Sequence, residues 1–148
     1  MKVEIKNRWT GDIQFVAEIE ADENTMLSVK TGLAVRWGLE NSADLSESNL
    51  IGANLIGDNL IESNLTWADL SESNLTGANL TWANLIGASL YESNLTGTNL
   101  TESNLSESNL TGANLTGANL TGADLTGADL TGAFMWIGGK KYLLVEDK

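Results

Sequence analysis

The chain has 148 residues, 42% of them apolar, and a formal net charge of −12 at pH 7, which is the profile of one modest folded domain. No run of eighteen apolar residues predicts a membrane span, and with no signal-like segment at its start the expected location is the cytoplasm. The lack of cysteine and histidine excludes disulfides, thiol nucleophiles, histidine bases and the common zinc sites, so we expect a non-enzymatic protein without cofactor or metal.

Residues 1–42 are predicted to form an N-terminal cap. Alternating apolar and polar residues over 2–6 and 13–20 predict a β-hairpin with a turn near 7–12. Such a cap is needed because the first repeat of an array exposes unpaired strand edges and apolar side chains.

A helix is expected to follow the hairpin. The polar run 22–25 is predicted to cap it, and the helix then runs from about residue 26 to residue 39. Gly32 and Gly38 inside this segment weigh against a helix, because glycine is a poor helix former.

From Leu45 to Leu130 every fifth residue is leucine, eighteen in succession, and each follows Asn, Asp or, once, Ser. A helical period of 3.6 would spread these leucines around a cylinder, and a strand period of two would send alternate ones outward. Each repeat therefore needs a short extended segment and a corner, and four repeats close a square coil. Stacked coils bury the leucines on one axis, because only neighbouring repeats complete the core of a solenoid.

The repeat reads Ala-Asp-Leu-Ser-Glu at 43–47, Ala-Asn-Leu-Thr-Trp at 78–82 and Ala-Asp-Leu-Thr-Gly at 123–127. These residues resemble the pentapeptide-repeat family, and the resemblance covers residues 43–132. It implies an all-β fold, a right-handed quadrilateral parallel β-helix, and ninety residues at twenty per coil give about 4.5 coils. Residues 1–42 resemble the N-terminal segment of some phage and bacterial members.

Residues 133–148 are expected to end the array as a degenerate last repeat followed by a strand cap. Phe134 takes the polar position of the repeat, and Met135 takes the leucine position. The Gly-Gly pair at 138–139 permits a tight turn, after which residues 140–145 can return as a strand over the last coil.

The leucine and the residue two before it are predicted to point inward in every repeat. That second position holds Ala ten times and Ser six times, with Thr98 and Asp58 as the exceptions. Small residues belong there because the leucines already fill the core. We expect Asp58 to reach polar groups of the N-terminal cap, such as Arg36, and the alternative is a buried acid with a functional role.

Every inward serine follows a glutamate. The pairs are Glu47-Ser48, Glu62-Ser63, Glu72-Ser73, Glu92-Ser93, Glu102-Ser103 and Glu107-Ser108. One explanation is that glutamate and glycine specify two turn geometries, with the serine hydroxyl bonded to a nearby carbonyl. Duplication of a ten-residue cassette explains the coupling equally well.

The acidic residues are concentrated in the repeats, because residues 43–132 hold eleven of them and no Lys or Arg. They are Asp44, Glu47, Asp58, Glu62, Asp69, Glu72, Glu92, Glu102, Glu107, Asp124 and Asp129, and all except Asp44 and Asp58 are expected to form an acidic surface. Over a length of roughly 22 Å this is about one charge per 2 Å, close to the ~1.7 Å of duplex DNA. The density argues against direct binding of nucleic acid and favours a partner with a basic groove.

Glu72 and Glu92 stack on one corner, about 4.8 Å apart. One carboxylate pair supplies too few oxygen ligands for a calcium ion. We therefore predict no metal site there and interpret the two acids as a solvated pair.

Four outward apolar residues, Trp67, Trp82, Ile86 and Tyr91, lie close enough in the predicted coils to form one patch. Exposed aromatic side chains that gather on a surface are typical of protein interfaces. We take these residues as the candidate partner-binding site. The alternative is that a terminal segment of the chain folds over them.

Three isoleucines, Ile51, Ile56 and Ile61, project outward from successive faces of the first coil. Exposing three such side chains together is costly. We expect the N-terminal cap to bury them, and the alternative is a second partner site.

One face of the predicted solenoid carries no charge. It stacks Asn54, Asn74, Asn94 and Asn114 beside Ile56, Thr76, Thr96 and Thr116. Asparagine ladders stabilise stacked parallel strands by hydrogen bonding along the stack, which is the structural interpretation. A remote alternative is an ice-binding surface, in which the flat Asn and Thr rows order water.

Three classes of function follow. The first is a non-catalytic scaffold or interaction module, a rigid acidic β-helix that binds a protein partner or a second copy of itself, with no membrane association. The family resemblance also implies DNA mimicry, in which an acidic shaft occupies the DNA groove of a type II topoisomerase. Against mimicry, the acids are expected to be spread over several faces. The third class, an enzyme, is disfavoured by the missing catalytic groups.

Overall fold

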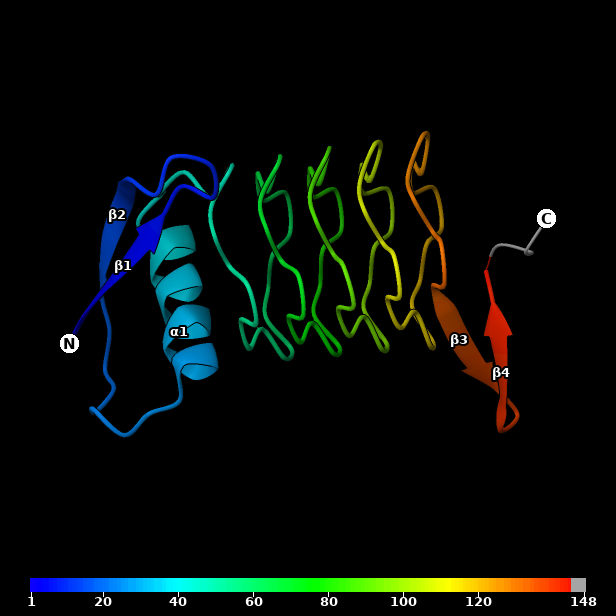
Figure 1. Cartoon of the computed structure of the whole chain (residues 1–148), viewed down its shortest axis with the longest axis horizontal. Helices are drawn as coiled ribbons and strands as arrows, with labels where there is room; N and C mark the ends of the chain where they lie inside the picture. Colours follow the sequence, from blue (N-terminus) through cyan, green and yellow to red (C-terminus); the bar gives the residue numbers. More distant parts are fainter. Residues whose placement is uncertain (145–148) are drawn as a thin grey trace.

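A computed structural model describes residues 1–144 of the chain. Its regular elements are β1 (Lys2–Lys6), β2 (Ile13–Glu18), α1 (Leu27–Glu40), β3 (Phe134–Ile137) and β4 (Lys140–Leu143). Figure 1 shows β1, β2 and α1 at one end of a regular stack of turns, with β3 and β4 at the other end. We call residues 43–132, which form this stack, the shaft. No helix within the described residues is long and apolar enough to cross a lipid bilayer.

Residues twenty apart along the shaft are parallel neighbours, as the bridges from Asn54 to Asn74 and from Asn74 to Asn94 show. The N–H of Leu55 donates to the carbonyl of Asn74 at 2.8 Å, and the N–H of Asn74 donates to the carbonyl of Ala53 at 2.9 Å. The chain therefore runs parallel to itself at a spacing of twenty residues, which is four repeats. Residues twenty apart form what we call a column.

Each repeat turns at the residue two after its leucine, which we call the corner. The N–H of Ala53 donates to the carbonyl of Leu50 at 3.1 Å, and this bond closes a four-residue turn. The corner residue has φ of 52° to 59° in the eight repeats with Glu or Trp and 63° to 71° in the ten with Gly. Because all of them share the left-handed conformation, the prediction of two turn geometries is wrong.

The inward serines make hydrogen bonds only in part. Ser103 donates its hydroxyl to the carbonyl of Leu100 at 2.8 Å, as predicted, and Ser48 donates to the side chain of Gln14 at 2.7 Å. Four serine hydroxyls have no partner within the described residues: Ser63, Ser73, Ser93 and Ser108. Carbonyl bonding therefore does not account for the glutamate-serine coupling as a whole, and duplication of a cassette stays the remaining explanation.

The polar residue before each leucine holds the extended part of the repeat. The side-chain oxygen of Asn74 accepts hydrogen bonds from the N–H of Thr76 at 3.1 Å and from its hydroxyl at 2.6 Å. Asn94 and Thr96 make the same pair of bonds. Asn and Asp suit this position because their short side chains bond to the backbone two residues on.

The inward leucines form one continuous core. Those from Leu50 to Leu115 are at most 1% exposed, with the inward Ala and Ser side chains packed between them. Leu120, Leu125 and Leu130 are only partly buried, so the core closes less completely at this end of the shaft.

The N-terminal hairpin covers the edge of the first coil. β1 and β2 pair antiparallel, and beyond β1 the chain continues along the shaft with an antiparallel bridge between Asn7 and Ser48. The N–H of Asn49 donates to the carbonyl of Lys6 at 2.7 Å, and the N–H of Arg8 donates to the carbonyl of Glu47 at 2.7 Å. The hairpin thereby satisfies backbone groups that a bare first coil would leave unpaired.

α1 forms close to the predicted residues, but the predicted side-chain cap is wrong. Its N-cap residue is Met26, and no side chain bonds to the first turn. Asp22 instead accepts hydrogen bonds from the N–H groups of Asn24 and Thr25, at 2.9 and 2.8 Å. The Asp22 carboxylate therefore stabilises a separate turn that precedes α1 and does not cap the helix.

Gly32 lies where α1 meets the first coil. A Cβ atom on Gly32 would collide with the carbonyl oxygen of Asn54, and the N–H of Asn54 donates to the carbonyl of Ser28 at 2.9 Å. Glycine costs about 1 kcal/mol relative to alanine inside a helix, and here that cost permits the close approach. Gly38 likewise faces the ring of Phe15.

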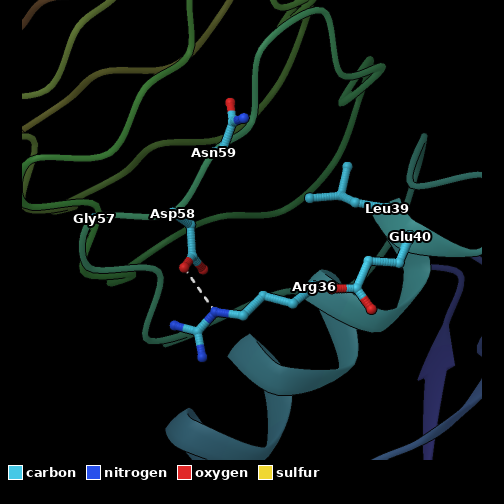
Figure 2. A pocket seen from close by; sticks show the side chains of 6 residues that line it. All are labelled: Arg36, Leu39, Glu40, Gly57, Asp58 and Asn59. Carbon is cyan, nitrogen blue, oxygen red and sulfur yellow. Dashed lines mark hydrogen bonds and ion pairs between the residues drawn. The ribbon is translucent and has the colours of Figure 1, made fainter.

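An ion pair joins α1 to the first coil. Figure 2 shows Arg36 reaching across to Asp58, and Arg36 Nε lies 2.6 Å from Asp58 Oδ1. The side chain of Asp58 is 10% exposed and that of Arg36 is 41% exposed. The expected contact between the irregular acid and the cap is therefore confirmed.

The expected burial of Ile51, Ile56 and Ile61 is wrong, because each is between 41% and 51% exposed. The cap packs against the open end of the first coil and pairs with its edge. It leaves these three isoleucines uncovered, so their side chains stay in contact with solvent.

The C-terminal hairpin ends the shaft. Phe134 continues one column through a parallel bridge to Asn114, after which β3 and β4 pair antiparallel across a turn at 138–139. β4 pairs with β3 and leaves the last coil partly exposed, so the predicted cover over that coil is incomplete. Val145, the last residue of the predicted return strand, lies outside the described residues.

We predict that Arg36→Ala lowers the free energy of unfolding by about 2 kcal/mol, because it leaves a buried carboxylate without its partner. Asp58→Ala, which installs the commonest inward residue, should cost less than about 1 kcal/mol, and the double variant should match Asp58→Ala. Denaturant unfolding followed by circular dichroism measures all three. Equal losses of unfolding free energy in Arg36→Ala and Asp58→Ala would contradict the prediction that the unpaired carboxylate is the costly group.

Candidate functional site

The columns sort the outward residues of the shaft by chemistry. Two adjoining sides and their three corners carry ten of the eleven acids, and the eleventh, Asp58, points inward. We call this surface the acidic half, and its acids are Asp44, Glu47, Glu62, Asp69, Glu72, Glu92, Glu102, Glu107, Asp124 and Asp129. The other two sides form the neutral half, whose outward residues are Asn, Thr and Ile. These two sides meet at a corner column made only of glycine: Gly57, Gly77, Gly97 and Gly117. The acids thus occupy two of the four sides and three of the four corners.

The aromatic residues lie in the acidic half as well. Trp82 occupies the corner column of Glu62 and Glu102, and Trp67 occupies the next one, with Glu47 and Glu107. Both tryptophans have φ of 58°, a conformation that costs a residue with a side chain about 1–2 kcal/mol. Glycine would fit these corners without that cost, so the fold itself gives no reason for tryptophan there.

Trp67 lies over its neighbour in the next coil. A Cβ atom on Gly87 would collide with the Trp67 ring, so the ring covers that glycine. Ile86 adjoins Gly87 and is only partly exposed, whereas Trp67 remains 42% exposed. The structure thus brings Trp67 and Ile86 to one corner of the acidic half.

Trp82 and Tyr91 flank that corner. Trp82 is 56% exposed, and its indole N–H donates to Glu102 Oε2 at 3.3 Å. A hydrogen bond to Glu92 and the negative charges of Glu92 and Glu72 raise the pKa of Tyr91 above its usual range. Within residues 1–144 the only stacked rings are those of Phe15 and Trp37 in the N-terminal cap. The four residues of the predicted patch, Trp67, Trp82, Ile86 and Tyr91, therefore do not form a stacked cluster.

Arg8 and Trp9, which the sequence did not single out, also reach the acidic half. Arg8 Nη1 donates to the carbonyls of Trp67 and Ala68 at 3.0 and 3.1 Å, and Nη2 lies 3.5 Å from Asp69 Oδ2. The Arg8 guanidinium stacks on Trp9, with its central carbon 4.4 Å from the ring centre. Both residues stand in the hairpin turn, where no periodic pattern marks them.

Hydrogen bonds stabilise the charged form of the two acids at the C-terminal end of the shaft, Asp124 and Asp129. Thr126 donates its hydroxyl and its N–H to Asp124, at 2.6 and 2.9 Å, and these bonds lower the pKa of Asp124. Hydrogen bonds from Thr131 lower the pKa of Asp129 in the same way. Within the described residues no group of three or more acids is placed to hold a metal ion.

A pocket of about 400 Å³ lies between α1 and the first coil, lined in part by Arg36, Glu40 and Asp58 (Figure 2). Its buried carboxylate already pairs with Arg36, and this pair attaches the helix to the shaft. We therefore regard the pocket as part of the cap and the acidic half as the candidate site.

Comparison with known proteins identifies the repeats. The family profile described as pentapeptide repeats matches in eight copies, over residues 41–77, 63–102, 78–117 and 98–136. No curated protein matches.

Two solved structures of pentapeptide repeat proteins, which fold as right-handed β-helices, are similar. Rfr23 from the cyanobacterium Cyanothece 51142 is 41% identical with a TM-score of 0.57, and the match covers 60% of each chain. The protein alr5209 from Nostoc PCC 7120 is 38% identical with a TM-score of 0.50, and the match covers 52% of this chain and 64% of that one. The chain thus spans less than two thirds of either protein.

We predict that Trp82→Gly leaves the free energy of unfolding unchanged or raises it by up to about 1 kcal/mol. The reason is that glycine adopts the left-handed conformation of this corner without the strain that a residue with a side chain has there. Gly77→Ala, at a glycine with φ of 67° and open space around it, should lower it by about 1 kcal/mol. Thermal unfolding of both variants measures the effect. A loss above about 1 kcal/mol for Trp82→Gly would mean that the indole ring stabilises the fold.

Proposed function

The chain belongs to the pentapeptide-repeat family, and we propose that it is a non-catalytic interaction module whose acidic half binds a protein with a basic surface. In this proposal the shaft is a closed right-handed four-sided β-helix of about 4.5 coils. Residues 1–42 and, among the described residues, 133–144 cap its two ends. The shaft serves as a rigid support, and recognition lies in the side chains at its corners.

The observation that carries this proposal is the segregation of charge and aromatic residues. Nothing in the repeat requires it, because the neutral half is built from the same turns and the same leucine core. One side of a shaft that concentrates negative charge attracts a basic protein and speeds its association. Exposed tryptophans within the charged surface supply the apolar anchors that dominate binding energy at interfaces.

The same columns make the acidic half rigid before any partner arrives. The backbone of each coil bonds to the coils on either side, as where the N–H of Asp69 donates to the carbonyl of Ser48 and the N–H of Leu70 donates to the carbonyl of Ser89. Little backbone freedom is then lost on binding, which favours affinity. The open end of the last coil, at Leu120, Leu125 and Leu130, is the surface that the predicted self-association would use.

We predict that a partner captured from an extract of the source cells is lost when Trp67 and Trp82 are both replaced by glycine. Glycine suits both corners, so the fold should persist while the exposed rings are removed. Ile61→Thr in the neutral half is the matched control, because threonine already occupies its column at 81, 101 and 121. Affinity capture with quantitative mass spectrometry compares the three proteins, and equal capture by all of them would overturn the assignment of the surface.

DNA mimicry is the second candidate function. The gathering of ten acids on two adjoining sides and their three corners favours it, because a groove that binds DNA contacts a negatively charged surface. We predict that micromolar protein inhibits gyrase supercoiling or protects the enzyme. Glu62→Gly with Glu102→Gly should weaken the effect and Ile61→Thr should not. Supercoiling that none of these proteins alters would exclude this function.

A further inference from the structure

The turn of the N-terminal hairpin places an arginine on the acidic half. Arg8 Nη1 bonds to two backbone carbonyls, those of Trp67 and Ala68, and Nη2 faces the carboxylate of Asp69. The central carbon of the guanidinium lies over the ring of Trp9, 4.4 Å from the ring centre. The side chain is only 15% exposed, so this is a close-fitting position on the shaft.

The three contacts suit a guanidinium and not an ammonium. Arginine presents five donors in a fixed plane, which lets it bond to two adjacent carbonyls and a carboxylate at once. It is also more weakly hydrated than lysine and stacks on aromatic rings. Arg8 therefore shows that backbone carbonyls and a carboxylate of the acidic half already hold one guanidinium of this chain.

The same kinds of group recur around Trp82. Glu62 and Glu102 stand on either side of Trp82 in one corner column, and neighbouring coils are about 4.8 Å apart. The indole N–H already holds the Glu102 carboxylate, which leaves the ring 56% exposed. Within residues 1–144 neither glutamate forms an ion pair with Lys or Arg, and no donor bonds to the corner carbonyl of Trp82.

A similar group surrounds Tyr91 on the far side of the acidic half. Glu72 and Glu92 share the corner column next to Tyr91. A hydrogen bond to Glu92 and the negative charges of both glutamates raise the pKa of the Tyr91 phenol. Tyr91 is 39% exposed. The acidic half thus carries an aromatic residue with two carboxylates at each of two corners, on either side of the corner that bears Trp67.

We propose that the acidic half recognises arginine side chains, and that its partner is a protein with an extended segment bearing at least two arginines. One guanidinium stacks on Trp82 between Glu62 and Glu102. The other packs against Tyr91 and pairs with Glu72 and Glu92. This inference deepens the proposed function and rests on it, and Arg8 supplies the bonding pattern.

Three fluorescein-labelled peptides of nine residues test the proposal, identical except that three positions hold arginine, lysine or citrulline. Fluorescence anisotropy at moderate salt measures their binding to the full chain. We expect the arginine peptide to bind at least about fivefold more tightly than the lysine peptide, and the citrulline peptide to bind most weakly. Trp82→Gly should weaken the arginine peptide about fivefold, and Ile61→Thr should leave it unchanged.

Equal affinity for the arginine and lysine peptides would overturn arginine recognition, because net charge alone would then explain binding. Unchanged affinity for Trp82→Gly, or no binding of the arginine peptide at millimolar protein, would overturn it as well. Each of these results leaves the interaction function intact if cellular capture still depends on Trp67 and Trp82. Loss of that dependence, with tight arginine binding retained, would instead contradict the proposed function.

Discussion

The hydrogen bond across each corner, from the residue after the corner to the leucine carbonyl, sets every larger feature of the molecule. It occurs together with a left-handed conformation at the corner residue, as at Gly77 with φ of 67° and at Glu72 with φ of 59°. It also turns the chain at every fifth residue, and after four such turns the chain runs beside itself, so that leucines stack and outward residues fall into columns. The charge pattern of the acidic half is thus a consequence of regular turning and of which residues occupy the corners.

The division into two halves separates stability from recognition. Leucines and small residues inside the shaft, with hydrogen bonds along the Asn and Asp columns, stabilise both halves in the same way. The backbone of a left-handed corner does not need glutamate or tryptophan, because glycine adopts the same conformation with less strain. Their presence on three corner columns, and their absence from the fourth, therefore points to selection for a surface. A rigid surface that spans two sides of a shaft suits an extended partner better than it suits a small ligand, which binds in a concave pocket.

Much of this architecture is readable from the sequence, because the leucine period and the twenty-residue spacing are local and exact repeats. The contact between Asp58 and Arg36 was also predictable, since one acid interrupts a series of small inward residues. The isoleucines of the first coil were misplaced because sequence separates inward from outward but does not show how far a cap extends. Arg8 was missed because its position depends on the long-range docking of a hairpin turn, which has no period.

The two ends of the shaft differ in how completely they are closed, and this gives the molecule a direction. At the start, β1 pairs with the first coil and α1 packs over it, whereas the leucines at 120, 125 and 130 are only partly covered. In a stack where each coil contacts only its neighbours, the least covered coil opens first and the opening spreads inward. Thermal opening therefore begins at the C-terminal end and reaches Trp67 and Trp82 only after the coils on that side of them have opened, so these two residues lie in the more durable part of the protein.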